Sequence, residues 1–168
     1  MKKTLSITVY NESGVLTRIS TVFSSRGFNI ESIAVGPTAN SGVSKIIIVL
    51  IGDEQTIEQI TKQLKKLIQV IEVKNITARP CVERELMLIK VKSSVSTRSF
   101  ILEIVNIFRS KVVDISDNSV TIEVTGDPGK ISTIQELLKP FTILEIVRTG
   151  KISVERELGI NTEFLKNI

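Results

Sequence analysis

Residues 10–37 read YNESGVLTRISTVFSSRGFNIESIAVGP, and this stretch decides the fold. Its first residues end a strand and form a turn, because Asn, Ser and Gly favour turns and helix starts. Apolar residues such as Val15, Ile19 and Phe23 then recur at helical spacing. Gly27 suits the left-handed position that closes a helix, and residues 28–38 turn to strand-like composition. The stretch therefore predicts a strand, a helix over residues 15–26 and a second strand.

The flanking sequence completes a six-element unit. Residues 43–51 contain the run SKIIIVLI, which is typical of a strand covered on both faces, and Asn40-Ser41-Gly42 supplies the hairpin turn before it. Asp53 is expected to cap a second helix, whose apolar residues recur at helical spacing. With strands at residues 3–10 and 70–76, the order is βαββαβ, the ferredoxin-like arrangement.

The second half of the chain repeats this order. We expect a strand at 85–92, a helix at 96–108, a hairpin of strands 111–116 and 119–125, a helix opened by Asp127-Pro128 and a strand at 141–148. The prediction is an α+β protein with two tandem ferredoxin-like βαββαβ domains. Their expected limits are residues 1–76 and 85–149, with a linker at 77–84 and a C-terminal tail at 150–168.

Composition narrows the function. The 168 residues contain no His, which removes the most frequent general base, the usual nucleophile pairs and most zinc sites. Cys81 is the single cysteine, so no disulfide is expected, and an inert residue is favoured over a redox switch. We therefore expect no catalytic residue and no metal site in this chain.

Charge and hydropathy point away from nucleic acid and membranes. The net charge of +4 is spread over both halves. Lys62, Lys65 and Lys66 are expected to form a solvated helix face, with a phosphate or nucleic-acid role as the alternative. No apolar run is long enough to cross a membrane, and the N-terminus leads straight into a strand without a signal segment. We expect the protein to stay in the compartment where it is made.

Several strings carry a resemblance to a known family. NESGVLTRISTVFSSRGFNIESIAVGPT resembles the ACT-domain signature of the small regulatory subunits of acetolactate synthase (acetohydroxyacid synthase), and the similarity continues through VERELMLIKV, TGDPGKI and EIVRTGKI. It implies an N-terminal ACT domain followed by a second ACT-like domain. It also implies a subunit without catalysis of its own, which activates the catalytic large subunit of this acetolactate-forming transferase and confers feedback inhibition by valine in branched-chain amino-acid synthesis.

The resemblance also implies cofactors, partners and a location. This chain would hold no cofactor, whereas the large subunit would carry thiamine diphosphate, Mg and FAD. Two copies would pair through their ACT domains. The tail GINTEFLK is similar to that of plastid members, so the expected location is the bacterial cytoplasm or, for a plastid-encoded chain, the plastid stroma.

An effector site follows from the resemblance and from the chemistry of the first helix start. Backbone N–H groups near Gly14, Val15 and Leu16, together with the helix dipole, would meet the carboxylate of valine. The partner copy would bring Asn29 and Ile30 toward Asn11 and Gly14.

Two further residues of the first repeat complete this prediction. Gly36 stands where family members commonly have Ala and is a candidate pocket wall. The simpler interpretation makes Asn11 and Ser13 helix caps and lets Gly14 relieve crowding. The equivalent turn of the second repeat, residues 93–97, has no Gly, and Val95 is expected to crowd a carboxylate there.

Two other classes of function stay open at this point. One is a free-standing amino-acid sensor that acts on another enzyme or on transcription, although no helix-turn-helix or basic stripe is visible. The other is a small enzyme on a ferredoxin-like scaffold, which the fold by itself does not exclude.

Overall fold

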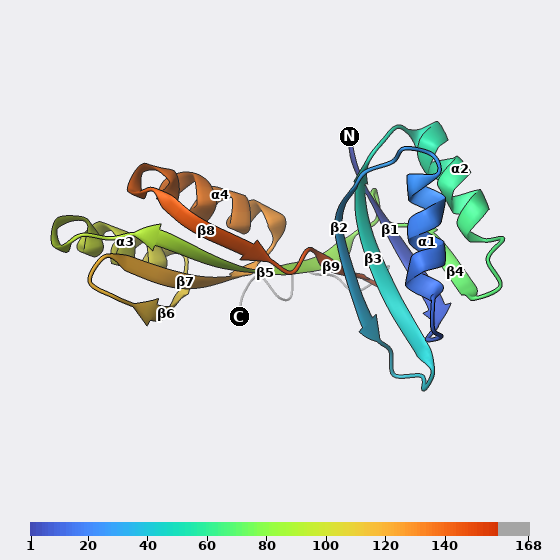
Figure 1. The fold of residues 1–168 in the computed structure, drawn as a ribbon, viewed down its shortest axis with the longest axis horizontal. Helices are drawn as coiled ribbons and strands as arrows, with labels where there is room; N and C mark the ends of the chain where they lie inside the picture. Colours follow the sequence, from blue (N-terminus) through green and yellow to red (C-terminus); the bar gives the residue numbers. More distant parts are fainter. Residues whose placement is uncertain (158–168) are drawn as a thin grey trace.

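The computed structural model describes residues 1–157, which form two units, each with an antiparallel sheet and two helices on one face (Figure 1). The sheet of the first unit has the strand order β2-β3-β1-β4, so β2 and β4 are its edges. The elements of this unit are β1 (Lys2–Tyr10), α1 (Val15–Ser24), β2 (Ile30–Pro37), β3 (Val43–Ile51), α2 (Glu54–Leu64) and β4 (Val70–Asn75).

The first core forms between the sheet and the two helices because apolar residues alternate along β1. Leu5, Ile7 and Val9 are fully buried against residues from α1 and α2. In β3, Ile47 and Val49 are also buried, although they point to the face without helices. The prediction that residues 43–51 form a strand covered on both faces is confirmed.

The second unit repeats this plan, with the strand order β6-β7-β5-β8. Its buried core again joins alternate strand residues to one face of each helix. The expected α+β fold with two ferredoxin-like units is confirmed. The elements of this unit are β5 (Cys81–Lys92), α3 (Val95–Ile107), β6 (Lys111–Ile115), β7 (Ser119–Gly126), α4 (Pro128–Leu138), a 3₁₀ turn (Lys139–Phe141) and β8 (Ile143–Arg148).

The region between the units differs from the expected linker and tail. β5 begins at Cys81 instead of Glu85, and a ninth strand, β9 (Ile152–Glu155), lies where only a tail was expected. The two segments pair antiparallel, from Cys81 opposite Glu155 to Arg84 opposite Ile152. Arg79, in the segment expected to be a linker, contacts Glu155 at 2.7 Å. The remaining tail, including GINTEFLK, falls outside the described residues from position 158 on.

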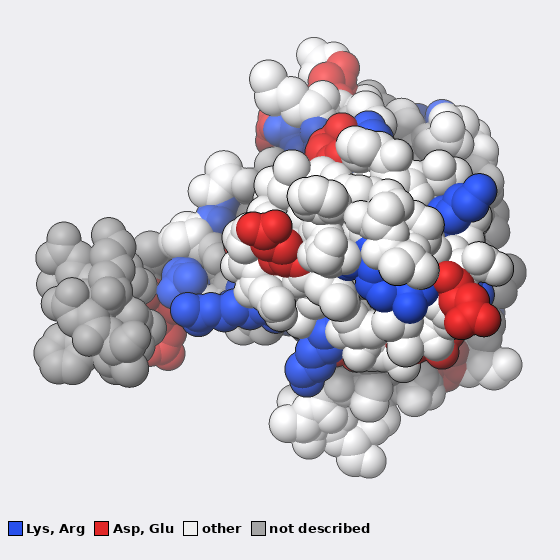
Figure 2. Space-filling model, turned by 90° about the vertical axis from the view of Figure 1, so that its left-hand side faces the viewer, with Lys and Arg blue, Asp and Glu red and all other residues white. Residues whose placement is uncertain are grey.

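Within the described part of the chain, no helix is long and apolar enough to span a membrane. On the face in Figure 2, basic and acidic side chains are scattered among uncharged ones and form no continuous basic stripe. Lys62, Lys65 and Lys66 are exposed, and Lys62 contacts Glu58 at 2.7 Å. The pKa of Glu58 is lowered by this hydrogen bond and by the charge of Lys62. The arrangement agrees with a solvated helix face.

Candidate functional site

The start of α1 is open. Gly14 takes the N-cap position with φ 81°, in the left-handed region, and no side-chain hydrogen bond caps the helix. A Cβ added at Gly14 would meet no atom within 4 Å. The interpretation of Asn11 and Ser13 as caps of this helix is therefore wrong, and so is that of Gly14 as relief from crowding. The Val15 N–H donates to the Glu12 carbonyl at 3.3 Å, whereas the N–H groups of Leu16 and Thr17 have no acceptor among the described residues and are free for a ligand.

The other predicted residues surround this helix start to different extents. Asn11 and Leu16 are exposed beside it, whereas Val15 is buried and belongs to the core. Gly36 lies near the end of β2, where a Cβ would also meet open space. Pro37, the next residue, pairs with Ser44, which in turn pairs with Val9. Gly36 is thus at the same end of the sheet as α1's start.

Asn29 and Ile30 lie at the opposite end. Ile30 pairs with Leu50, and Leu50 pairs with Lys3 at the beginning of β1. Val9 is six positions after Lys3 in β1, which puts Ile30 on the order of 20 Å from α1's start. The chain does not bring the two halves of the predicted site together by itself.

The second unit treats its equivalent helix start differently. Ser94 caps α3 in a reciprocal capping box: the Thr97 N–H donates to Ser94 Oγ at 3.3 Å, and the Ser94 N–H donates to Thr97 Oγ1 at 2.9 Å. Arg98 fills the adjacent turn by donating to the carbonyls of Ser116 and Asp117. Val95 is 92% exposed beside this helix start, and its expected effect on an approaching carboxylate stays a prediction. The start is closed by its own hydrogen bonds.

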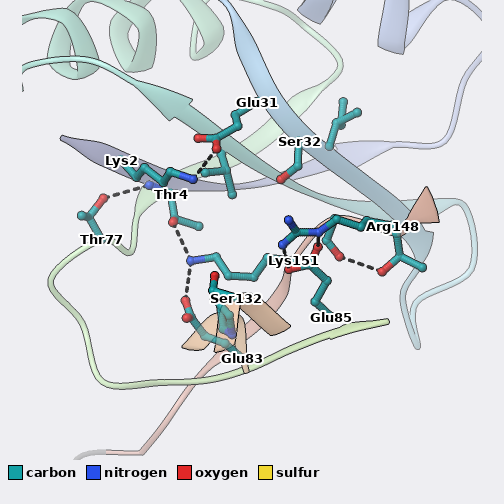
Figure 3. Close-up of a pocket in the computed structure, with 15 residues that line it drawn as sticks. Lys2, Thr4, Glu31, Ser32, Thr77, Glu83, Glu85, Ser132, Arg148 and Lys151 are labelled. Carbon is teal, nitrogen blue, oxygen red and sulfur yellow. Dashed lines mark hydrogen bonds and ion pairs between the residues drawn. The ribbon is translucent and has the colours of Figure 1, made fainter. Parts of the chain in front are cut away.

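A cavity of about 510 Å³ between the two units was not predicted from the sequence. Figure 3 shows its charged side chains: Lys2 contacts Glu31, Arg148 binds Glu85, and Lys151 lies between Thr4 and Glu83. The cavity contains three basic and three acidic side chains, each in an ion pair. It includes none of the predicted effector residues. Its lining comes from four segments, residues 2–4, 31–33, 83–85 and 148–151, with two residues from α4 and one each from β3 and the loop after β4.

Arg148 and Glu85 form a bidentate ion pair in this cavity. Arg148 Nε donates to Glu85 Oε1 at 2.6 Å, and its terminal N–H₂ group donates to Oε2 at 3.0 Å. The hydrogen bonds from Arg148 to Glu85 raise the pKa of the guanidinium, against the effect of burial. Since Glu85 is only 6% exposed, this bidentate pair is a fixed part of the cavity wall.

Comparison with known proteins decides the family. A family model described as "AHAS small subunit-like ACT domain" matches residues 5–72, and one described as "Small subunit of acetolactate synthase" matches residues 84–157. The acetolactate synthase small subunit of Aquifex aeolicus is 49% identical over 163 residues, covering 96% of this chain and 85% of the relative. This chain belongs to the acetolactate synthase small-subunit family.

Other members of the acetolactate synthase small-subunit family agree. The Bacillus subtilis small subunit is 49% identical over 157 residues, covering 93% of this chain and 91% of that protein. The crystal structure of the small subunit from Thermotoga maritima has a TM-score of 0.84 at 38% identity and covers 94% of this chain and 99% of its own. Membership gives this chain a regulatory role through its ACT domains and implies a catalytic large subunit as its partner.

Proposed function

We propose that this chain binds valine at the start of α1 and thereby confers feedback inhibition on the acetolactate synthase large subunit, which it otherwise activates. The open helix start at Gly14 is the observation that carries the proposal. The ACT model for residues 5–72 includes this start, and the uncapped first turn offers backbone N–H donors and the positive end of the helix dipole to a carboxylate.

The ammonium group and the side chain of valine need a second surface, which a partner copy supplies in this proposal. β2 is an edge strand with unpaired backbone groups. When two β2 edges pair antiparallel about a two-fold axis, the beginning of one strand lies beside the end of the other. Asn29 and Ile30 of one copy then approach Asn11, Gly14 and Gly36 of the other. The separation of the two half-sites within one chain supports this homodimer.

The two units have different tasks in this proposal. The segment 1–76 is the effector-binding domain, and 85–149 is a second ACT-like domain without an amino-acid site, because its helix start is closed. This chain needs no cofactor for that task, and thiamine diphosphate, Mg and FAD belong to the large subunit. We place the complex in the bacterial cytoplasm or the plastid stroma. Relatives from Aquifex aeolicus and, with the word chloroplastic in its name, from Arabidopsis thaliana support these two locations.

Reconstitution tests the function. Acetolactate formation is measured with the chain alone, with the large subunit alone and with both, and each mixture is then titrated with valine. We expect no activity from the chain alone, activation of the large subunit and inhibition by valine. Melting temperatures of the chain with valine, leucine and isoleucine identify the effector, since a ligand of the folded state raises the melting temperature. Absence of activation would rule out the proposed function and leave a free-standing sensor.

Sedimentation tests the dimer. At micromolar concentration with valine present we expect a two-fold symmetric dimer, because the pocket is incomplete in one chain. A monomer that still binds valine under these conditions would contradict the shared pocket.

A further inference from the structure

The strand β2 takes part in two places of the molecule at once. Ile30, its first residue, and Asn29 just before it form the half-site that the proposed pocket takes from this segment. The next residues, Glu31, Ser32 and Ile33, line the cavity between the two units. Asn29 and Ser32 are three residues apart, about 10 Å along an extended chain. The proposed effector site therefore lies about 10 Å from the cavity that borders the second unit.

Glu31 occupies a β-bulge. Ile30 pairs with Leu50 and Ser32 pairs with Val49, so Glu31 is an extra residue without a partner in β3. Bulges redirect side chains and are frequent next to functional sites. In Figure 3 the Glu31 side chain points to Lys2. Its charge contributes to the raised pKa of Arg148, after the larger effect of Glu85, so the field of β2 reaches the second unit.

The loop between β8 and β9 touches β2 directly. Gly150 is buried with φ 79°, and a Cβ at this position would lie 3.1 Å from the Cβ of Ser32 and 3.6 Å from the carbonyl oxygen of Ile33. A side chain at position 150 would therefore not fit without a shift, and the Gly150 backbone lies close against Ser32. A displacement of β2 at Ser32 therefore displaces Gly150 as well.

Lys151 stabilises this contact through a hydrogen bond and an ion pair. Its Nζ donates to Thr4 Oγ1 of β1 at 3.0 Å and to Glu83 Oε1 of β5 at 2.6 Å. The Lys151 side chain is 16% exposed and that of Glu83 is 30% exposed, so water screens the pair less than it screens a surface pair. One ammonium group thus joins the first sheet, the β8–β9 loop and the strand that leads into the second unit.

We infer that residues 31–33 of β2 and residues 148–151 form the relay that carries the effector signal from the first unit to the second, with Lys151 as the residue that holds the two in register. The inference rests on the proposed valine site, because that site defines the signal. Lys151 is a positioning residue in this relay: it touches no effector and acts through Thr4 and Glu83.

The test compares Lys151→Met with Lys139→Met. The control also removes an ammonium group 2.6 Å from a Glu carboxylate, but its partner, Glu136, is in the same unit and both side chains are more than half exposed. In the complex with the large subunit, Lys151→Met is expected to keep activation without valine. Its half-inhibitory valine concentration should rise about 2- to 30-fold, the range for residues along a coupling network. Valine affinity of the small subunit alone should stay the same, and Lys139→Met should behave as wild type in every assay.

Hydrogen exchange of the free small subunit gives a readout that needs no effector. Lys151→Met should speed exchange of the amides of residues 31–33 in the other unit, and Glu31→Gln should speed exchange at residues 149–151, because coupling between two sites is reciprocal. Lys139→Met should change neither.

Each outcome decides a separate point. Wild-type inhibition in Lys151→Met, or loss of valine binding by that variant alone, would overturn the relay. If valine fails to inhibit the wild-type complex, the proposed effector is wrong, and the exchange experiment decides the coupling by itself. Unchanged exchange in both units would then overturn it.

Discussion

The starts of α1 and α3 occupy equivalent places in two repeats of one fold, yet they have opposite chemistry. At α1 a glycine with positive φ leaves the first turn without a side-chain cap. At α3, Ser94 and Thr97 satisfy each other's backbone N–H groups, and Arg98 occupies the neighbouring turn. A repeat whose own side chains accept from the N–H groups at the helix start gains stability. A repeat that leaves these N–H groups without a side-chain acceptor can use them to bind an anionic ligand. In the proposed function, this difference gives ligand recognition to the first unit and mechanical tasks to the second.

Removing the second unit is expected to have the largest effect on valine inhibition. A fragment ending at Arg79 keeps Ile76, which is 4% exposed, and Thr77, whose hydroxyl accepts a hydrogen bond from the Thr4 N–H at 2.9 Å. We expect this fragment to fold, to activate the large subunit in part and to lose most of the valine inhibition, because the relay is missing. A titration with and without valine measures both effects.

A shorter fragment serves as the control for this truncation. Ending the chain at Lys74 also removes Ile76, and loss of one buried Ile costs about 1.5–3 kcal/mol, so this fragment should melt lower. A fragment ending at Arg79 that is folded by circular dichroism but does not activate at saturation would contradict the division of tasks.

Gly14→Asp closes the open start with a negative charge. The carboxylate would repel that of valine, so valine inhibition should vanish while activation survives. An Asp at a helix start is favourable, which offsets part of the roughly 1–2 kcal/mol that a side chain costs in the left-handed region. Gly14→Asn has the same shape without the charge and should keep part of the inhibition. Equal, full inhibition in both variants, measured by valine titration, would refute the site.

Asn29→His changes the other half of the proposed pocket. The imidazole ring replaces a compact amide that donates and accepts hydrogen bonds, so valine should bind more weakly while the large subunit is still activated. Calorimetric titration of the small subunit with valine measures the loss. An unchanged affinity for valine would show that Asn29 of the partner copy does not contribute to the site.

Ser94→Ala opens the closed start. Loss of an N-cap costs about 1 kcal/mol, which corresponds to a melting temperature lower by about 2–4 °C in a protein of this size. Valine inhibition should not change. Ser13→Ala, the matched substitution before α1, should leave the melting temperature the same, because no side chain caps that helix. A loss of stability in Ser13→Ala equal to that of Ser94→Ala would contradict the difference between the two starts.

The smallest effect concerns Asp53, which caps α2 in the first unit by accepting from the Thr56 N–H at 2.8 Å. Hydrogen bonds from Thr56 lower the pKa of this carboxyl below its ordinary value of 3.8. The contribution to stability is therefore present above the ordinary pKa and is lost as the pH falls through the lower pKa of the folded state. In Asp53→Asn, which caps equally well, the melting temperature should be unchanged at neutral pH and should fall less between about pH 5 and about pH 3. Identical acid profiles would show that the cap does not titrate.

Local patterns in the sequence predict the fold well, because each element carries its own signals. Examples are the alternation in β1, the turn at Gly42 and the Asp127-Pro128 helix start, each of which depends only on neighbouring residues. β9 was missed because Ile152–Glu155 is short and pairs with residues about 70 positions earlier, which no local pattern reveals. Residues 81–84 are predicted as part of a linker for the same reason, since their strand partners lie far away in the sequence.

Only part of the candidate site could be predicted. The sequence indicated an unusual helix start at Gly14, but the absence of a cap depends on where the Asn11 and Ser13 side chains point. The interdomain cavity collects residues from distant segments, and the bulge at Glu31 arises from the register between β2 and β3. A sequence shows which side chains are present, whereas register decides which of them meet.

The strand β5 passes from one set of partners to another without a break: Arg84 pairs with β9, and Glu85, the next residue, pairs with β7. Its 12 residues extend about 40 Å, and successive side chains alternate between its two faces. One residue inserted between Arg84 and Leu86 would therefore turn the second unit over relative to the first and carry Lys151 away from Thr4. Two inserted residues would keep the two units in the same orientation, whereas one would not. During evolution, the length of β5 between the two units can therefore change only by an even number of residues.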